Sequence, residues 1–344
     1  MQSKRDIILL WLPSPMGDAI LTVPALRAIR EHFAERRITY FCKPFVRDIL
    51  TPCRFNDDWI TETKCNPFSI GRMLRDRGYS DAILFKNSFG SGLSVFLAGI
   101  PHRIGYSRDG RGIFLTEKLY PVKDAQGGYK PISMVDYYLA IASRLGAKVS
   151  DRRIEIGVLE TDKASVQEKL PGIFESASPV VILVPGGAFG PSKCWPSARF
   201  AEVADSLISN YGAQVLISVS PEPAELSIAR QICAQSSNEL INLGEKNLSI
   251  GELKAVYSVC ELVISNDTGP RHIGIGLGRK VVSLFGPNHP AWTDTQYDKE
   301  IQIVGDCECI FCGRKVCNRK RHYCMESITV QRVLEAAEKL LESG

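Results

Sequence analysis

The chain of 344 residues is 44% hydrophobic and 23% charged, which is the composition of a folded globular protein with room for two domains. No apolar run approaches the roughly 18 residues that span a membrane, and no basic stretch interleaved with aromatic residues indicates nucleic-acid binding. The net charge of +4 is uneven, because residues 1–160 hold 24 Lys and Arg against 17 Asp and Glu, whereas the rest hold 18 against 21. The basic first half fits an acidic acceptor, an anionic membrane or ordinary solvated surface.

Eleven cysteines are scattered along the chain, apart from one cluster near its end. A long chain without a secretion signal keeps such thiols reduced, which predicts a cytoplasmic protein. Residues 7–13 are apolar like the core of a signal peptide, but Gly17-Asp18 interrupts them at once and no small-residue cleavage site follows. We expect a first buried strand there instead.

Short apolar runs alternate with amphipathic stretches along the first half of the chain. The runs predict strands, and the stretches between them predict helices. The expected strands lie at 6–12, 38–42 and 81–85, and the expected helices at 19–33, 70–77, 93–98 and 133–145. This repetition predicts a parallel sheet with helices on both faces.

The same alternation restarts after a looser, charged stretch at 151–178. Strands are expected at 180–184, 214–219 and 280–285, with another that ends at 264, and helices at 196–211, 225–234, 270–277 and 328–342. We therefore predict an α/β protein of two doubly wound, Rossmann-like domains with a cleft between them. The expected domains are residues 1–165 and 175–326, followed by a C-terminal helix at 327–344.

The turn at 266–270 joins a buried strand to a short helix, and Pro270 suits the first position of that helix. Such a turn lies at the carboxyl edge of a parallel sheet, where ligands bind. The helix N-terminus there presents N–H groups and the positive end of the helix dipole, which suit a phosphate group. The alternative is that Asp267 and Thr268 merely cap the helix.

Three motifs occur in a characteristic order: PSPMGD at 13–18, PGGAFGPSKCWP at 185–196 and SNDTGPRH at 265–272. In this order and spacing they resemble the ADP-heptose:lipopolysaccharide heptosyltransferases of glycosyltransferase family nine. Residues 87–89 and 98–103 are more specifically similar to the heptosyltransferase II branch. The resemblance covers nearly the whole chain and implies the GT-B fold, with inverting and metal-independent sugar transfer. The absence of any Asp-x-Asp pair agrees with a reaction that needs no metal ion.

The resemblance implies transfer of L-glycero-D-manno-heptose from ADP-heptose to the inner core of lipopolysaccharide. The partners implied are ADP-heptose, a lipid A–core acceptor and transient contact with the cytoplasmic face of the inner membrane, for a monomer that binds no nucleic acid. No cofactor is required. The alternatives are a GT-B transferase with another nucleotide-sugar donor or a protein acceptor, and a sugar-nucleotide binding protein without turnover. Retention of both Asp18 and Lys193 argues against a pure binding protein.

Two residues match the family's catalytic positions. Asp18 matches the proposed general base for the acceptor hydroxyl, and its alternative role is to cap the helix that follows. Lys193 can supply a cation to the departing diphosphate, and its alternative role is that of a solvated surface lysine.

The resemblance also implies binding residues on both sides of the reaction. Those expected near the donor are Gly17, Gly186, Glu222, Asp267, Thr268, Gly269, Pro270 and His272, with a structural histidine as the alternative for the last. Those expected near an anionic acceptor are Asn87, Ser88, Arg103 and Arg108, since arginine binds two oxygens at once. Each of these four is otherwise ordinary surface.

The chain departs from the family pattern in two places. Arg271 stands where relatives more often carry an apolar residue, so it either adds a second cation near the diphosphate or points to solvent. Cys309, Cys312, Cys317 and Cys324 lie within sixteen residues, with Cys307 and His322 alongside. They could hold a structural zinc ion, but the spacing matches no standard zinc motif and a loop of reduced thiols is the alternative.

Overall fold

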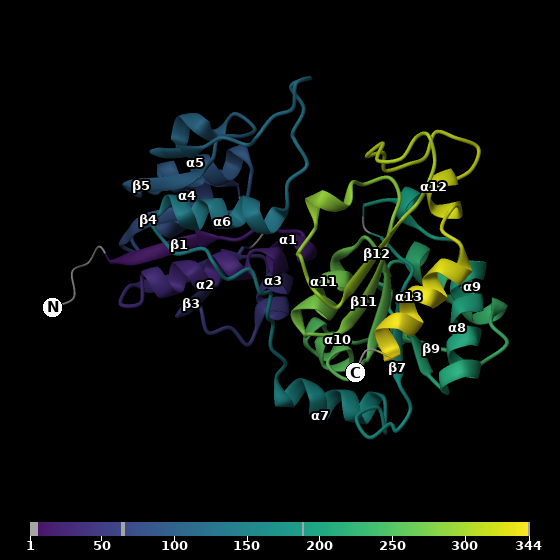
Figure 1. The fold of residues 1–344 in the computed structure, drawn as a ribbon. Coiled ribbons are helices and arrows are strands. Elements are labelled where there is room, and N and C mark those ends of the chain that lie inside the picture. Colours follow the sequence, from purple (N-terminus) through teal and green to yellow (C-terminus); the bar gives the residue numbers. More distant parts are fainter. Residues whose placement is uncertain (1–5, 63–65, 188, 343–344) are drawn as a thin grey trace. The chain divides into compact units, whose positions relative to one another are not determined.

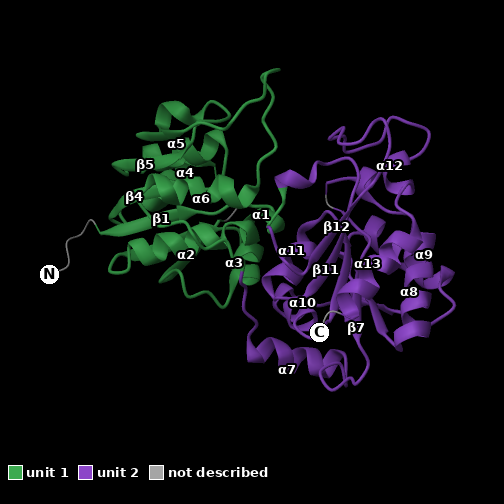
Figure 2. Ribbon diagram, in the orientation of Figure 1, with its two compact units in different colours: residues 1–154, 293–295 green, residues 155–292, 296–344 purple. Residues whose placement is uncertain are grey.

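The computed structural model describes residues 6–62, 66–187 and 189–342 (Figure 1). The chain divides into two compact units, which are residues 1–154 with 293–295 and residues 155–292 with 296–344 (Figure 2). The division falls between Ile154 and Glu155, earlier in the chain than the expected limit of the first domain. The helix at 160–169 therefore belongs to the second unit. No helix among the described residues is long and apolar enough to cross a membrane.

The first unit is built on a six-stranded parallel sheet with the order β3-β2-β1-β4-β5-β6. Its strands are β1 (Ile7–Trp11), β2 (Arg37–Cys42), β3 (Asp58–Thr61), β4 (Tyr79–Leu84), β5 (His102–Tyr106) and β6 (Glu117–Leu119). Its helices are α1 (Met16–Leu21), α2 (Val23–His32), α3 (Pro44–Leu50), α4 (Pro67–Arg75), α5 (Phe89–Leu97) and α6 (Met134–Arg144), with a 3-10 turn η1 (Arg111–Phe114). The central strands β1 and β4 are buried on both faces, which explains their continuous apolar runs.

The single helix expected at 19–33 is wrong, because the structure has two helices that meet at Thr22. Pro24 is the second residue of α2 and has no N–H, so it cannot donate to the last turn of α1. The Thr22 hydroxyl instead donates to the Ala19 carbonyl at 2.6 Å. The break leaves α1 as a short separate helix that carries Asp18 next to the end of β1.

The second unit repeats the same architecture, with the strand order β12-β11-β10-β7-β8-β9, again all parallel. Its strands are β7 (Val180–Val184), β8 (Gln214–Ile217), β9 (Ile241–Asn242), β10 (Leu262–Asn266), β11 (Lys280–Phe285) and β12 (Glu300–Val304). Its helices are α7 (Glu160–Lys169), α8 (Ser197–Tyr211), α9 (Pro223–Gln235), α10 (Ile250–Tyr257), α11 (Gly269–Gly276), α12 (Tyr323–Glu326) and α13 (Val330–Glu342). Helix α13 packs on this unit, since Val333, Ala337 and Leu340 join the core formed by α8 and the sheet.

Each sheet reverses its strand order once, and the reversal lies between β1 and β4 in the first unit and between β7 and β10 in the second. At such a switch point the loops that follow the two strands leave toward opposite faces and open a crevice at the carboxyl edge, where α/β proteins bind ligands. The loops concerned are those after β1, β4, β7 and β10. The three sequence motifs lie at three of these four loops.

Candidate active site

Asp18 lies in the first turn of α1, directly after the loop that follows β1. Pro15 is the N-cap residue of α1, and no side chain caps this helix. The alternative that Asp18 is a helix cap is therefore wrong. Burial raises the pKa of Asp18 from its ordinary value to about 6, because the charged carboxylate loses its hydration. Gly17 precedes it within the same turn.

Asn87, in the loop after β4, is held by two side chains. Its amide nitrogen donates to the Tyr137 hydroxyl at 3.1 Å, and its amide oxygen accepts from Nη2 of Arg111 at 2.8 Å. Arg111 is fully buried and also donates to the carbonyls of Tyr106, at 2.8 Å, and Lys86. Burial lowers the pKa of Arg111 to about 10. The structure thus adds Arg111 to this edge of the sheet.

Sequence reasoning did not single out Arg111, although it lies in the Gly- and Arg-rich loop that also contains Arg108. The guanidinium of Arg108 stacks over the ring of Tyr129, 4.3 Å from its centroid. Its Nε is buried and has no hydrogen-bond partner among the described residues. The two arginines give the carboxyl edge of the first sheet the cationic character that an anionic acceptor requires.

The other two residues expected near the acceptor, Ser88 and Arg103, make hydrogen bonds to nearby backbone groups. The Ser88 hydroxyl accepts a hydrogen bond from the Ser91 N–H at 3.1 Å and so caps α5. Arg103 is the second residue of β5 and therefore lies toward the amino end of the sheet, away from Asp18 and Asn87. Its side chain donates to the backbone carbonyls of Phe114 at 2.6 Å and Ile100 at 2.5 Å. The structure does not bring Arg103 to the carboxyl edge.

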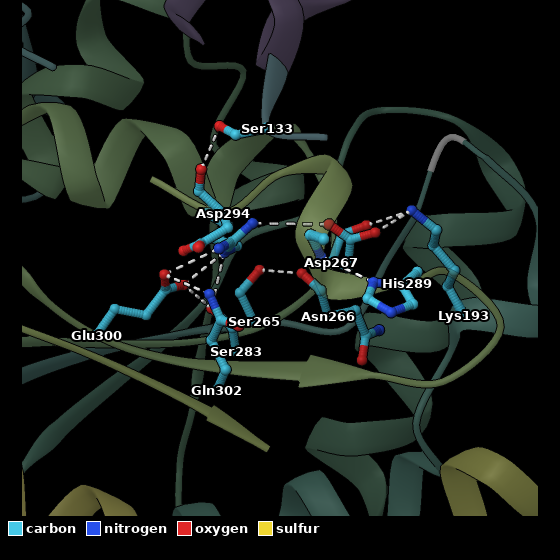
Figure 3. Close-up of polar contacts among 12 residues, drawn as sticks. Ser133, Lys193, Ser265, Asn266, Asp267, Ser283, His289, Asp294, Glu300 and Gln302 are labelled. Carbon is cyan, nitrogen blue, oxygen red and sulfur yellow. Dashed lines mark hydrogen bonds and ion pairs between the residues drawn. The ribbon is translucent and has the colours of Figure 1, made fainter. Parts of the chain in front are cut away.

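In the second unit, Lys193 follows the loop after β7 and is only 8% exposed. Its ammonium donates to both the side chain and the backbone of Asp267, at 2.5 Å to Oδ2 and 2.8 Å to the carbonyl (Figure 3). The ammonium also lies 4.8 Å from the ring centroid of Phe189. The alternative of a solvated lysine is wrong, because this side chain is buried and paired.

Arg271 and Glu300 extend this pair into a buried network of charges (Figure 3). Arg271 is fully buried, and its Nη1 lies 3.7 Å from Oδ1 of Asp267. Its Nε and Nη2 donate to the two oxygens of Glu300 at 2.6 and 2.9 Å. The Ser283 hydroxyl donates to Oε1 of Glu300 at 2.5 Å. The alternative that Arg271 points to solvent is therefore wrong.

Burial raises the pKa of Asp267, but the charges of Lys193 and Arg271 outweigh it and hold that pKa below its ordinary value. Burial likewise raises the pKa of Glu300, and the charge of Arg271 again outweighs it, so this pKa is also lowered. Both carboxylates are therefore ionised at neutral pH. The order of charges along the network is cation, anion, cation, anion, so it is neutral as a whole.

The N-terminus of α11 lies directly after Asp267. Thr268 is its N-cap residue without a side-chain hydrogen bond to the helix, so simple capping by Thr268 is not what the structure shows. Gly269 and Pro270 open the helix, and the N–H of Arg271 donates to the Thr268 carbonyl at 3.2 Å. Because proline has no N–H, the N–H of Gly269 is the one in this first turn without an intrahelical acceptor. His272 is 2% exposed, and burial lowers its pKa to about 3. Its Nδ1 has no hydrogen-bond partner among the described residues.

The loops after β7 and β8 are joined by Glu225, in the first turn of α9. Its carboxylate accepts from the N–H of Gly187 at 3.1 Å and from the N–H of Ser220 at 2.8 Å. A Cβ at Gly186 would lie 2.6 Å from Cδ of Glu225, so a larger residue there would displace this carboxylate from the loop. Glu222, the residue expected near the nucleoside, is exposed at the N-cap of α9. Glu225 is the carboxylate that contacts the loop, and its position was not predicted.

The cysteine-rich segment at 307–324 contacts the loop that carries Lys193 and accepts hydrogen bonds from it. The N–H of Ser192 donates to the Lys315 carbonyl at 3.2 Å, and its hydroxyl donates to the Arg314 carbonyl at 2.5 Å. Gly190 has φ of 152°, and a Cβ there would lie 2.4 Å from the Lys315 carbonyl oxygen. The close approach of two backbones therefore requires glycine at this position.

Four of the five cysteines of this segment line one cavity of about 110 Å³, together with His322 and Ser192. These four are Cys309, Cys312, Cys317 and Cys324. Within the part of the chain that the structure describes, however, no three His, Cys, Asp or Glu side chains are arranged to hold a metal ion. The zinc site stays a prediction, and no catalytic role is assigned to it.

Comparison with known proteins identifies the family of this chain. The model of glycosyltransferase family 9 (heptosyltransferase) matches residues 68–322. The chain belongs to glycosyltransferase family 9. Lipopolysaccharide heptosyltransferase 2 of Salmonella typhimurium is 28% identical to it over 97% of this chain and 98% of the relative.

Solved structures of family 9 enzymes agree with the observed architecture. ADP-heptose lps heptosyltransferase II of E. coli superimposes with a TM-score of 0.79 at 26% identity, over 97% of this chain and 98% of the other. E. coli heptosyltransferase WaaC with ADP gives a TM-score of 0.72 at 16% identity, over 97% and 99% of the two chains, and shows the shared fold. The GT-B fold expected from the sequence is confirmed.

The two units of this family 9 glycosyltransferase offer different chemistry. The first offers one half-buried carboxylate with a raised pKa, and Arg111 beside Asn87. The second offers a buried ammonium beside a helix N-terminus. A raised carboxylate pKa suits proton transfer near neutral pH, and an ammonium beside a helix N-terminus suits a phosphate.

Proposed function

We propose that this enzyme transfers L-glycero-D-manno-heptose from ADP-heptose to a heptose of the lipopolysaccharide inner core, with inversion and without a metal ion. It would work as a monomer at the cytoplasmic face of the inner membrane, on a lipid A–core acceptor. The similarity to heptosyltransferase 2 over 97% of the chain supports the substrates. The observation that carries the chemistry is the half-buried carboxylate of Asp18, with its raised pKa, at one switch point and the buried ammonium of Lys193 at the other.

The proposed step is a single displacement. The acceptor hydroxyl gives its proton to the carboxylate of Asp18, and its oxygen forms a bond to the anomeric carbon of the heptose. The bond between that carbon and the β-phosphate oxygen breaks, and ADP leaves with the electron pair. Because a base is most effective when its pKa is near the working pH, the raised pKa of Asp18 supports this role.

Lys193 and the N-terminus of α11 would stabilise the negative charge that develops on the departing diphosphate. Lys193 rests on Asp267, and Arg271 lies 3.7 Å from the same carboxylate. When Lys193 moves to the diphosphate, Asp267 therefore keeps a cationic neighbour. The buried carboxylate is not left uncompensated, which would be costly.

Release of ADP from ADP-heptose tests the proposal, with and without a truncated lipid A–core acceptor. The wild type should release ADP only with the acceptor, and Asp18→Asn should lower the rate by about 10²–10⁴, the usual contribution of a general base. Asp48→Asn is a matched control, because Asp48 is an exposed carboxylate on α3 of the same unit. A chelator should leave the wild-type rate unchanged, and NMR of the product should show an inverted anomeric centre.

Different failures would point to different alternatives. Turnover of another nucleotide sugar in place of ADP-heptose would mean a different donor, and turnover only with a protein acceptor would mean a different acceptor. Binding of ADP-heptose without turnover on any acceptor would make the chain a sugar-nucleotide binding protein. An unchanged rate for Asp18→Asn would remove Asp18 as the base.

A further inference from the structure

Large apolar side chains gather on one exposed face of the first unit, formed by α4, α5 and η1. Ile113 is 76% exposed, Phe68 67%, Phe96 49% and Phe89 47%. We call these four residues the aromatic patch. Three of the four phenylalanines that are exposed in the described part of the chain belong to it. A contiguous group of this kind marks a surface that binds something, unlike apolar residues exposed singly.

The aromatic patch is continuous across α5 and η1. Phe89 and Phe96 are seven residues apart on α5 and therefore share one face of the helix. Both rings contact the ring of Phe114, with centroids 5.1 and 5.5 Å apart. Ile113 is the neighbour of Phe114 in η1, so the exposed face runs from α5 onto this turn.

Helix α4 continues the same face. It packs beside α5 (Figure 1), and Cγ of Pro67 lies 3.4 Å from the place where a Cβ of Gly90 would stand. The first turns of the two helices are therefore in contact, and Phe68 lies in the first turn of α4. Arg72 and Arg75 follow Phe68 by four and seven residues, so they lie along the same side of α4.

Cations border the aromatic patch. Nη2 of Arg75 donates to the Leu97 carbonyl at 2.9 Å, which places this arginine at the end of α5 beside Phe96. The guanidinium of Arg103 lies 5.5 Å from the ring centroid of Phe96. Arg72, Arg75 and Arg77 are exposed on and just after α4, against one exposed carboxylate there, that of Asp76. The partner of this face is therefore apolar and negatively charged.

We propose that the aromatic patch and its bordering arginines dock on an anionic lipid surface. Exposed aromatic and branched side chains enter the boundary between headgroups and acyl chains, while arginines stay at the level of the phosphates. Basic residues near such a surface are attracted by its negative potential. The inference rests on the proposed function in that the acceptor itself is lipid-linked.

The position of the aromatic patch connects docking to the acceptor. Asn87 and Ser88 directly precede Phe89, so the patch begins where the loop after β4 ends. This loop is at the carboxyl edge of the first sheet, where Arg111 holds Asn87. A lipid surface on the patch would thus present the headgroup of a membrane-borne acceptor beside this edge.

Co-sedimentation with vesicles tests the proposal without any nucleotide sugar. Vesicles of phosphatidylglycerol and phosphatidylethanolamine supply the anionic surface, and vesicles of phosphatidylcholine supply a neutral one. The test variants are Phe68→Ser, Ile113→Ser and Arg72→Glu. The controls are Val316→Ser and Lys246→Glu, because Val316 is 67% exposed and Lys246 is also exposed, both in the second unit.

We expect each apolar substitution to weaken binding to anionic vesicles about tenfold, since burial of one such side chain is worth on the order of 1.4 kcal/mol. Arg72→Glu should weaken binding to anionic vesicles about tenfold or more and leave binding to neutral vesicles unchanged. Both controls should bind like the wild type. Phe68 and Ile113 have no partner in the core, so the melting temperature should stay the same.

Wild-type binding that these variants leave unchanged would overturn the proposal, and so would absence of wild-type binding to anionic vesicles. If the substitutions instead abolished a concentration-dependent dimer, the surface would be an interface between two copies of the chain. Activity on a soluble acceptor without lipid separates this test from the proposed function. That activity should be unchanged in all docking variants, whereas failure of the proposed function would show in the wild type itself.

Discussion

Charged side chains at the two switch points differ in whether they form ion pairs. In the second unit, Lys193 pairs with Asp267 and Arg271 pairs with Glu300. In the first unit, Asp18 makes no ion pair with any described residue, and Arg111 donates to carbonyls, an amide and a hydroxyl but to no carboxylate of the described chain. Both pKa values accordingly move toward the neutral forms.

The difference indicates separate roles for the two switch points. In a paired network the attraction between the charges offsets part of the cost of their desolvation, and the hydrogen bonds hold the side chains in fixed positions. An unpaired buried charge lowers stability, and a protein retains it where function requires it. The first unit thus carries a carboxylate that is ready to exchange a proton, while the second carries a cation that is stored on an internal carboxylate.

Breaking the network in the second unit should have the largest effect. Arg271→Met leaves the carboxylate of Glu300 buried without its partner, so the free energy of unfolding should fall by about 3–5 kcal/mol. Urea denaturation at pH 7 measures this change. The double variant Arg271→Met with Glu300→Gln should recover much of the loss, because no uncompensated charge then remains. Equal losses in the single and double variants would contradict the charge argument.

Removing the stored cation should affect catalysis more than folding. Lys193→Met should lower kcat by about 10²–10³, the cost of losing one group that stabilises transition-state charge. Asp267 keeps Arg271 nearby, so most of the stability should remain. Lys315→Met is the matched control, because Lys315 is exposed and its ammonium lies 6.0 Å from the same Phe189 ring. A comparable loss in the control would assign the effect to the loop rather than to Lys193.

Removing the charge of Asp18 in the first unit should raise stability, whereas breaking the charge network of the second unit lowers it. The pKa of Asp18 is raised to about 6 in the folded protein from 3.8, so the folded state binds this proton more tightly than the unfolded state. Stability therefore falls as the pH rises from about 4 to 6 and stays lower above that. Asp18→Asn should stabilise the protein by about 3 kcal/mol at pH 7, from two units of pKa, and by almost nothing below pH 4. Denaturation at pH 4 and pH 7 checks both values.

The same pKa predicts the acid limb of the activity. A base must be unprotonated, so kcat/KM should fall about tenfold for each pH unit below about 6. The residual activity of Asp18→Asn should lack this limb, while His272 cannot produce it because its pKa is lowered to about 3. A limb that persists unchanged in Asp18→Asn would belong to another group.

Local features of the sequence predicted the positions that depend on local structure. The turn at 266–270 follows a buried strand and precedes a helix, so its place at a sheet edge could be predicted, and the structure puts Asp267 there beside Lys193. The two parallel sheets could be predicted from the repetition of strands and helices. In contrast, the single helix expected at 19–33 contains Pro24, whose missing N–H separates α1 from α2.

Partners that are distant in sequence could not be predicted in this way. Arg271 meets Glu300 because β11 and β12 pair in one register, and no local pattern fixes that register. Arg111 meets Asn87 across 24 residues through the packing of η1 on α5. Arg103 was expected at the site for its charge, but its place near the start of β5 puts it at the other end of the sheet.

The contact between Gly190 and Lys315 also has a consequence for synthesis of the chain. Lys315 comes 122 residues after Lys193, and its carbonyl and that of Arg314 hold Ser192 in place. While the chain is being translated, β7 and the loop after it leave the ribosome long before the segment that supports them. The loop that carries Lys193 therefore lacks these two hydrogen bonds until residues 314 and 315 have been synthesised and have folded against it.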